Sequence, residues 1–506
     1  MNFSTAKLHN NQTIHTDEVP LFREDTFCDA LSELLDRKMR ICSFFGDRID
    51  QDVVKLYAVC ADDRGGVLHA LCGLFSHGSF SSLTGRHPQA HLFEREIYEQ
   101  TGCVPQGHPW LKPVRFPTTQ HYPQCPSVSI GETEFFRVSG DEIHQVAVGP
   151  VHAGIIEPGH FRFQCHGETV LHLEISLGYQ HRGIEEHLVN GPHPATPFQF
   201  EAIAGDTTIG HMTAYSRIVE SLCGYSAPHS AERIRAIALE LERCANHTGD
   251  LGAMAGDVGF LPTMSYCGRI RGDFLNHTAL LCGNRFGRGL VVPGGVGFGM
   301  DAEREKTLTE RLSATFEDFL GATNLLWESA SVMDRFERTG IISRETAQSI
   351  GLVGPAARAC GSLHDVRLDH AQGYYRFTHI PVCTADSGDV FGRGHVRWQE
   401  VRESVDFILR ELATPDTAGY RERGLCSPVE NGCRSDMFTV SLVEGWRGEI
   451  CHTAITDKTG KFRCYKVVDP SFHNWFGLAL AMRGQQISDF PLCNKSFNLS
   501  YCGFDL

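Results

Sequence analysis

The sequence predicts an α+β protein with a small N-terminal α/β domain and a larger, mainly helical domain that starts with a β-hairpin. In the first section, DVVKLYAVCADD is typical of a strand that runs into a turn, and GGVLHALCGLF forms a short apolar segment beyond it. Farther on, HFRFQCHG and TVLHLEISLGY flank His166-Gly167-Glu168, as expected for a hairpin. The segment PHSAERIRAIALELERCANHTGDLG has the apolar period of a helix.

This segment is the clearest helix signal in the chain. Pro228 lies near its start, Ser230 can cap it, and Gly249 or Gly252 can end it. One face carries an apolar stripe made of Ile234, Ile237, Leu241 and Cys244. A second face carries Glu240, Arg243 and His247, for which pairing with a neighbouring helix is favoured over proton conduction.

Composition shifts divide the chain into three parts. The α/β domain is predicted at residues 1–117, a Pro-, Thr- and Ser-rich linker at 118–145, and the mainly helical domain at 146–506. The opening MNFSTAKLHNNQTIHTDEVP is polar, so we expect the first ~20 residues to be flexible.

Charge and hydropathy exclude several function classes. The formal net charge of −15 argues against nucleic-acid binding, which needs a basic face to neutralise phosphates. Neither an apolar run of membrane-spanning length nor a signal peptide core is found in the sequence. We therefore expect any contact with a membrane to be made through a partner.

The chain has 19 cysteines, and no two are spaced as CxxC. Without such pairs, a local zinc or iron–sulfur site is not expected. Most of these cysteines are interpreted as reduced, buried small hydrophobes.

Several phrases resemble known respiratory subunits. FEREIYEQTGCVPQGHPWLKP resembles the signature of the C subunit of respiratory complex I; the matching residues are Glu94, Arg95, Glu96, Tyr98, Gly102, Gly107, His108, Pro109 and Leu111. GPVHAGIIEPGHFRF and LGYQHRGIEEHL resemble the D subunit and, more closely, the large subunit of group 4 nickel–iron hydrogenases. The same order continues with LELERCANH, CGNRFGRGLVVPGGV, GLVGPAARACGSLHDVR, GDVFGRGHVRWQEVRES, VEGWRGEI and DPSFHN.

The fused C-plus-D arrangement resembles the large subunit of formate hydrogenlyase. This resemblance implies that the larger domain has a helix-bundle core behind its N-terminal hairpin.

The resemblance also implies where a nickel site would lie. In the hydrogenase family, four thiolates from two CxxC motifs hold the metal. In AIAGDTTIGH, Gly205 and His211 match the family's Gly and His, but Ala204 and Thr207 stand at the two ligand positions. Hard hydroxyl oxygens and methyl groups suit nickel poorly, so we expect no nickel–iron centre.

The C-terminal pair is degenerate as well. Ser500 and Gly503 take the places of its cysteines, and Asn498 takes that of the preceding Asp. Cys502 is one residue out of step, and Cys493 lies well upstream. A hydrogenase with an unusual metal site stays a third, less favoured reading, which nickel analysis would decide.

Complex I uses the vacated space to bind a quinone headgroup through a His and a Tyr. In the resemblance, Ile156 and Gly205 stand at these two positions, although His152, His211 and Tyr215 lie nearby in the sequence. The resemblance leaves a quinone site open, because much of such a pocket is apolar surface.

Four residues are candidates for the cavity or a proton relay. Glu157 matches a proton-relay carboxylate of group 4 hydrogenases, against the alternative of a solvated loop glutamate. His152, His211 and Asp257 follow, with Asp257 ranked below Glu157. Arg182 is expected to pair with Glu185 within one helical turn.

Two functional hypotheses follow. In the first, the chain is a subunit of a membrane-associated oxidoreductase complex that couples electron transfer to proton or cation movement. Its partners would be a complex I B-subunit-like iron–sulfur protein, which holds the cluster, and antiporter-like and anchor membrane subunits. Through these partners the chain would lie in the cytoplasm, on the inner face of the cell membrane. No NAD site on this chain is expected, and the family name alone connects it with NAD. In the second, the chain is a non-catalytic structural or assembly relative.

Overall fold

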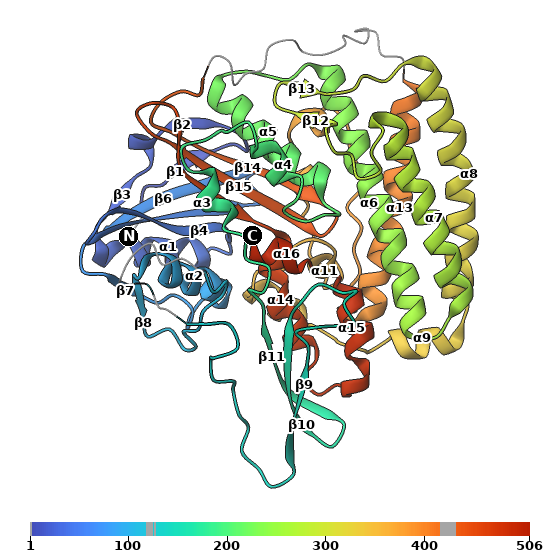
Figure 1. Cartoon of the computed structure of the whole chain (residues 1–506), viewed down its shortest axis with the longest axis horizontal. Helices are drawn as coiled ribbons and strands as arrows, with labels where there is room; N and C mark the ends of the chain where they lie inside the picture. Colours follow the sequence, from blue (N-terminus) through green and yellow to red (C-terminus); the bar gives the residue numbers. More distant parts are fainter. Residues whose placement is uncertain (1–2, 118–124, 126–127, 415–431) are drawn as a thin grey trace.

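The computed structural model describes residues 3–117, 125, 128–414 and 432–506 (Figure 1). The predicted α+β class is confirmed, since these residues form both helices and sheets, and most strand pairs are antiparallel. Figure 1 shows an N-terminal sheet at one end, a central sheet in the middle and a bundle of long helices at the other end. A further small sheet projects from the middle of the molecule.

The N-terminal sheet is built around an antiparallel meander of three strands. The predicted strand DVVKLYAVCADD forms the middle one, and the apolar segment beyond it forms the next. Two helices pack against the sheet and bury Phe27 and Phe93. The elements are β1 (Ala6–Leu8), β3 (Leu21–Phe22), α1 (Glu24–Asp36), β4 (Arg40–Asp50), β5 (Val53–Asp62), β6 (Val67–Phe75), β7 (Ser79–Ser81), α2 (His91–Thr101) and β8 (Val104–Gln106).

The first ~20 residues were expected to be flexible, but among the described residues 3–20 two short strands are hydrogen-bonded into two sheets. β1 pairs with β6 of the N-terminal sheet, whereas β2 (Thr13–His15) pairs with Met437–Thr439 of the central sheet. Leu8 and Ile14 are the buried side chains of these strands. Strands of three residues with polar exposed side chains are too short to show an alternating pattern in the sequence. Their conformation therefore depends on pairing with strands that are distant in the sequence.

The predicted hairpin is confirmed and has a third strand. β10 (His160–His166) pairs antiparallel with β11 (Thr169–Ser176) on one side and with β9 (Ile143–Val148) on the other. β9 starts inside the predicted linker at 118–145; residues 128–142 of that linker form neither helix nor strand. Residues 118–124 and 126–127 lie outside the described part of the chain.

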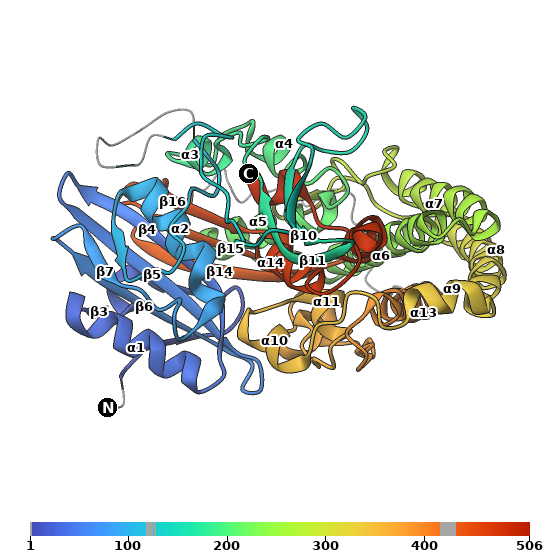
Figure 2. The same ribbon diagram turned by 90° about the horizontal axis from the view of Figure 1, so that it is seen from below.

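The central sheet was not predicted from the sequence. It consists of β14 (Met437–Gly445), β15 (Gly448–Thr456) and β16 (Phe462–Val468), with β2 at its edge. Most side chains of these strands are buried on both faces, so the strands lack the alternation of a half-exposed sheet. Helix α5 (Thr208–Cys223) packs on β14 and β15, and α11 (Gly354–Arg358) and α14 (Pro470–Ala481) contact β15 (Figure 2).

The helix predicted around PHSAERIRAIALELERCANHTGDLG is longer than expected. It forms α6 (His229–Asp257), starts after Pro228 without a cap from Ser230, and continues through Gly249 and Gly252. These glycines allow a neighbouring helix to approach, because a Cβ at Gly249 would lie 2.7 Å from Arg271 and one at Gly252 would lie 2.8 Å from Cys267. Tight packing thus overrides the helix-ending tendency of glycine.

Four long helices form the bundle, and α6 packs against two of its partners, α7 and α13. The predicted apolar stripe of α6 is buried. The remaining elements of this part are α3 (Ile184–Leu188), α4 (Thr196–Phe200), α7 (Leu261–Cys282), β12 (Val291–Val292), β13 (Gly295–Val296), α8 (Ala302–Trp327), α9 (Ala330–Phe336), α10 (Arg344–Ser349), α12 (Val366–Asp369) and α13 (Val390–Ala413).

The C-terminal segment returns to the middle of the molecule. α14 contacts β11, and the short helices α15 (Phe490–Phe497) and α16 (Tyr501–Asp505) follow it. One continuous apolar core includes Phe44, Phe163 and Phe472, so both predicted domains share it. Among the described residues, the helices are too short or too polar to cross a membrane.

Candidate functional site

The two segments that carry the degenerate ligand positions lie side by side. One precedes α5 at residues 201–207, and the other comprises the last nine residues. The guanidinium of Arg182 connects them, since it donates to the carbonyls of Ala202 at 2.7 Å, Ile203 at 3.0 Å and Cys502 at 2.9 Å. The fold therefore brings together positions that are almost 300 residues apart in the sequence.

A second arginine bridges the same two segments. Arg447, in the turn between β14 and β15, donates to the carboxylate of Asp206 at 2.6 and 2.8 Å. It also donates to the carbonyl of Asn498 at 2.6 Å. Burial alone would lower the pKa of Arg447, but the adjacent Asp206 carboxylate raises it above its usual value. A permanently charged group thus spans the site.

The four ligand positions offer no soft donor. Ala204 presents a buried methyl group and Gly503 has no side chain. The Thr207 hydroxyl accepts from the indole of Trp446 at 3.1 Å and donates to Asp206 at 3.1 Å. The Ser500 hydroxyl caps α16 and accepts from the Gly503 N–H at 2.9 Å. These residues do not fit a nickel–iron centre, because nickel in this arrangement requires thiolates and both hydroxyls are already hydrogen-bonded.

Neither nearby cysteine replaces the missing donors. The Cys502 thiol lies 3.4 Å from the Ser500 hydroxyl. The Cys493 thiol is buried elsewhere, 3.8 Å from the guanidinium of Arg393. In the described part of the chain, no cluster of potential metal ligands contains either thiol.

His211 lies in a buried row of polar side chains. Its Nε2 is 3.1 Å from the Asp469 carboxylate, and its Nδ1 is 3.1 Å from Nε2 of His452. His452 Nδ1 in turn lies 3.0 Å from the Tyr465 hydroxyl. Burial favours the neutral forms of these groups, yet the hydrogen bond and charge of His211 keep the pKa of Asp469 below its usual value.

At the neighbouring His452, burial and the adjacent side chain both favour the neutral form. Burial, and then repulsion from His211, lower the pKa of His452 well below its usual value. A carboxylate and a neutral imidazole thus flank His211 on its two sides, which suits a group that passes a proton.

Glu157 and His152 belong to one loop between β9 and β10. His152 Nε2 lies 2.9 Å from the Gly159 carbonyl, so this imidazole supports the loop. Glu157 is half-buried beside Cys502. Burial and then the Glu157 carboxylate raise the pKa of the Cys502 thiol to about 12.

Helix α16 connects the surroundings of Glu157 with those of His211. On one side its Cys502 contacts Glu157. On the other side a Cβ at Gly503 would lie 2.8 Å from the Asp469 carboxylate, which bonds His211. The structure therefore brings Glu157, His152 and His211 to one region.

Asp257 lies outside this region. It is exposed at the C-terminal end of α6. Asp250 lies two turns earlier on α6, about 10 Å away along the helix. Its carboxylate reaches the site, where it accepts a hydrogen bond from the side-chain amide of Asn498.

Two charge pairings from the sequence can be compared with the structure. From α6, Arg243 pairs with Glu400 of α13 at 3.4 Å and His247 pairs with the same carboxylate at 2.8 Å, which confirms the predicted pairing with a neighbouring helix. The predicted Arg182–Glu185 pair is wrong. Arg182 binds the three carbonyls described above, and Glu185 pairs with Lys466 of β16 at 3.0 Å.

Sequence reasoning missed Arg447, Asp206, Asp469 and His452 as site residues. Arg447 and Asp469 lie in VEGWRGEI and DPSFHN, two of the segments that resemble the family, so this resemblance could have identified them as site residues. Their partners are more than 200 residues away in the sequence, and only the fold pairs them.

Two sizeable cavities lie outside this cluster. One of 660 Å³ has largely apolar walls, which include Trp475 and Phe504, with Arg95 and His108 as polar groups. The other, of 740 Å³, lies where the N-terminal sheet meets α3 and β16, and charged groups such as Arg48 and Lys466 line it. Both have the size of ligand pockets.

Comparison with known proteins explains this arrangement. The model of the 30 kDa subunit of respiratory-chain NADH dehydrogenase matches residues 40–133, and that of the 49 kDa subunit matches residues 257–422. The chain fuses a domain of the complex I 30 kDa (C) type with one of the 49 kDa (D) type.

This C/D-type chain has relatives in hydrogenases and in complex I. It is 28% identical to formate hydrogenlyase subunit 5 of Escherichia coli over 83% of the chain and 76% of the relative. It is 29% identical to the carbon monoxide-induced hydrogenase of Rhodospirillum rubrum over 70% of the chain and 97% of the relative. NADH-quinone oxidoreductase subunit 4 of Thermus thermophilus is 28% identical over 69% of the chain and 90% of that subunit.

Proposed function

We propose that the C/D-type chain is a subunit of a membrane-associated oxidoreductase complex that couples electron transfer to proton or cation translocation. Its relatives include subunits named as hydrogenases, as NADH-quinone oxidoreductases and as part of an F420H2 dehydrogenase. These names describe subunits of electron-transfer complexes that act on different substrates. The proposal therefore concerns the complex and leaves open the substrate from which the complex takes its electrons.

A complex I B-subunit-like iron–sulfur protein is the proposed electron donor to this chain. The loop that carries Glu157 exposes apolar side chains, with Val151 76% and Ile155 87% exposed. Apolar side chains exposed beside a candidate site favour a protein partner there. Antiporter-like and anchor membrane subunits complete the proposed complex, on the cytoplasmic inner face of the membrane.

The observation that carries the proposal is the chemistry of the four ligand positions. Arg182 and Arg447 link the two segments that carry Ala204, Thr207, Ser500 and Gly503, and none of these four residues provides a sulfur atom. We infer that the chain works without a nickel–iron centre, with hydrogen replaced by a quinone-type or other acceptor. The apolar 660 Å³ cavity behind Phe504 supports an apolar acceptor of this kind.

Proton movement is assigned to two groups in this proposal. Glu157, half-buried at the loop, exchanges protons with solvent or with a partner subunit. The buried row of Asp469, His211, His452 and Tyr465 holds protons at atoms about 3 Å apart. Asp257, exposed on α6, is a less favoured relay group.

The alternative is a non-catalytic relative that keeps the fold and the docking surfaces. The hydrogen bonds of the Thr207 and Ser500 hydroxyls favour it, because one hydroxyl accepts from Trp446 and the other caps α16, and both are thus part of the fold. Glu157 distinguishes the two readings, since a structural part has no need of its proton.

The test uses the complex purified through an affinity tag without histidines on this chain. The iron–sulfur and nickel contents of the complex are measured first. The rate at which it reduces a quinone analogue is then measured for the wild type, for Glu157→Gln and for the control Glu168→Gln. Glu168 is exposed in the hairpin turn. We expect a cluster without nickel, and at least tenfold slower turnover for Glu157→Gln alone.

The other outcomes are equally informative. No turnover in any intact complex would support the structural alternative. One equivalent of nickel would overturn the inference drawn from the ligand positions.

A further inference from the structure

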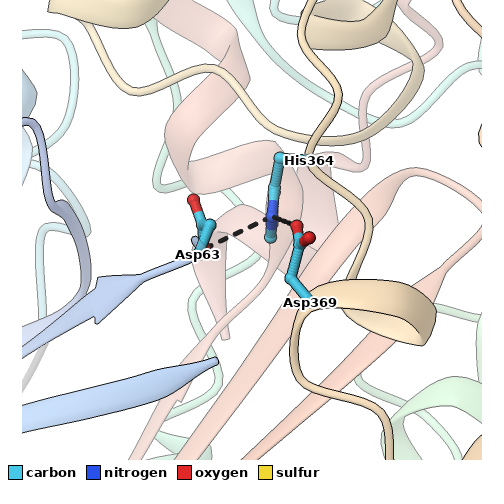
Figure 3. Close-up of side chains that lie close together, drawn as sticks. All are labelled: Asp63, His364 and Asp369. Carbon is cyan, nitrogen blue, oxygen red and sulfur yellow. Dashed lines mark hydrogen bonds and ion pairs between the residues drawn. The ribbon is translucent and has the colours of Figure 1, made fainter. Parts of the chain in front are cut away.

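A separate cluster of potential metal ligands lies at the junction of the two fused domains (Figure 3). Asp63 belongs to the turn between β5 and β6 of the N-terminal sheet. His364 precedes α12, and Asp369 is the last residue of that helix. Within the described residues, this is the one group of three or more His, Cys, Asp or Glu side chains whose ligand atoms all lie within 4.8 Å of one another.

The spacing of the three atoms suits a metal ion. His364 Nδ1 lies 2.8 Å from Asp369 Oδ2 and 3.4 Å from Asp63 Oδ1. Ligands about 2.0–2.2 Å from a tetrahedral zinc ion lie about 3.3 Å apart, so small side-chain movements suffice. Figure 3 shows the two carboxylates on either side of the imidazole.

The surrounding groups orient these ligands. The other ring nitrogen of His364, Nε2, lies 3.3 Å from the carboxylate of Glu449. A carboxylate on the far side of a metal-bound imidazole fixes the tautomer and makes the imidazole a better ligand. Arg40 holds Asp63 through two hydrogen bonds of 2.7 and 2.9 Å. Since Asp63 Oδ1 also contacts His370 Nε2 at 3.1 Å, Oδ2 is the oxygen that keeps a second lone pair.

Three carboxylates converge on His364, which is only 7% exposed. Asp63 and Asp369 lie on its Nδ1 side and Glu449 on its Nε2 side. Arg40 contacts Asp63 and Glu449, so the three carboxylates exceed this guanidinium by two negative charges, which equals the charge of one divalent ion.

A second histidine supports the same reading. His370 is 3% exposed, and its Nε2 lies 3.1 Å from Asp63 Oδ1. Its Nδ1 has no hydrogen-bond partner among the described residues. His370 thus helps to orient the Asp63 carboxylate through its Nε2, whereas its Nδ1 lies on the other side of the ring and is not one of the three converging ligand atoms.

We propose that Asp63, His364 and Asp369 bind a divalent transition metal ion, with zinc as the preferred ion. A ligand set of one imidazole and two carboxylates suits zinc better than magnesium or calcium, which prefer oxygen ligands alone. Since Asp63 comes from the N-terminal sheet and the other two ligands from the larger domain, the ion joins the fused domains. This site is independent of the proposed redox function.

The test uses the full-length chain with an affinity tag that lacks histidines. After chelator treatment, Zn²⁺ binding is measured by calorimetry, and Co²⁺ is added as a spectroscopic probe of tetrahedral coordination. We expect one equivalent of metal, a higher unfolding temperature with Zn²⁺, and at least tenfold weaker binding in His364→Ala and Asp369→Asn. The control His379→Ala, an exposed histidine close by in the sequence, should bind as the wild type does.

Two results would overturn the proposal. One is a folded wild-type chain that binds less than about 0.1 equivalent of Zn²⁺ and gives no Co²⁺ spectrum; a proton on His364 would then balance the carboxylates. The other is binding that is unchanged in folded His364→Ala, which would place the ion elsewhere. Glu449→Gln gives an independent readout, because loss of such an outer carboxylate weakens metal binding about 10- to 100-fold.

Discussion

The guanidinium of Arg447 forms a bidentate pair with the carboxylate of Asp206, with N–O distances of 2.6 and 2.8 Å. Arg447 follows β14, and Asp206 precedes α5, so the pair joins the central sheet to the segment with the first degenerate ligand pair. Arg447 also reaches the carbonyl of Asn498 next to the second pair. Arg447, like Arg182, thus contacts both segments that carry the degenerate ligand positions.

Arg447→Lys should destabilise the chain, because an ammonium cannot make the fork-shaped contacts with Asp206 and Asn498. Lysine keeps the positive charge but loses hydrogen bonds to a charged group, which contribute about 1.5–3 kcal/mol. We expect a drop of several degrees in the unfolding temperature, measured by differential scanning calorimetry. Asp206→Asn should lower the unfolding temperature less, because that carboxylate is 32% exposed. Since the two residues contact each other, the double variant should lose less stability than the sum of the two single losses.

Gly503→Ala should also destabilise the chain. Its Cβ would lie 2.8 Å from Asp469 Oδ2 and 2.9 Å from the Ser500 hydroxyl, in a closely packed region. Overpacking of this kind costs about 1–3 kcal/mol. Gly205→Ala is a matched control, because a Cβ there meets no atom within 4 Å. Equal thermal stability of the two variants would contradict the packing described around α16.

Glu242 should make stability decrease as the pH rises. Its carboxyl group accepts from the N–H groups of Ile209 at 2.7 Å and Gly210 at 3.2 Å, and burial raises its pKa to about 8. Since the pKa is higher in the folded chain than in the unfolded one, this stabilisation is complete below about pH 4.5 and is lost as the pH passes 8.

Glu242→Gln mimics the neutral acid and tests this dependence. The unfolding temperature of the wild type should fall relative to that of Glu242→Gln between pH 6 and pH 9. Parallel curves over this range would show that Glu242 keeps an ordinary pKa in the folded chain.

The contact between Glu157 and Cys502 can be tested by alkylation. The pKa of the Cys502 thiol is raised to about 12, so iodoacetamide should modify it slowly at pH 8 although it is partly exposed. Glu157→Gln removes a negative charge beside the thiol, and we expect labelling of Cys502 to become several times faster, as followed by peptide mass spectrometry. Glu168→Gln should leave the rate unchanged; an equal rate in all three proteins would contradict the contact.

Sequence patterns predicted the elements whose signals are local. The stripe of Ile234, Ile237, Leu241 and Cys244 predicted the longest helix, and the alternating runs around Gly167 predicted the hairpin. Strand β14 was missed because nearly all of its side chains are buried. Strand β2 was missed because Thr13–His15 is short and pairs with residues over 400 positions away.

The sequence by itself determined which donor atoms the chain offers at the four ligand positions, because composition cannot change on folding. The tertiary structure alone decided which groups surround those positions: Arg447 between Asp206 and Asn498, and His211 between Asp469 and His452. It likewise placed Asp63 beside His364 at the domain junction. Contacts between residues hundreds of positions apart depend on packing and on buried charge, and these leave no periodic trace in the sequence.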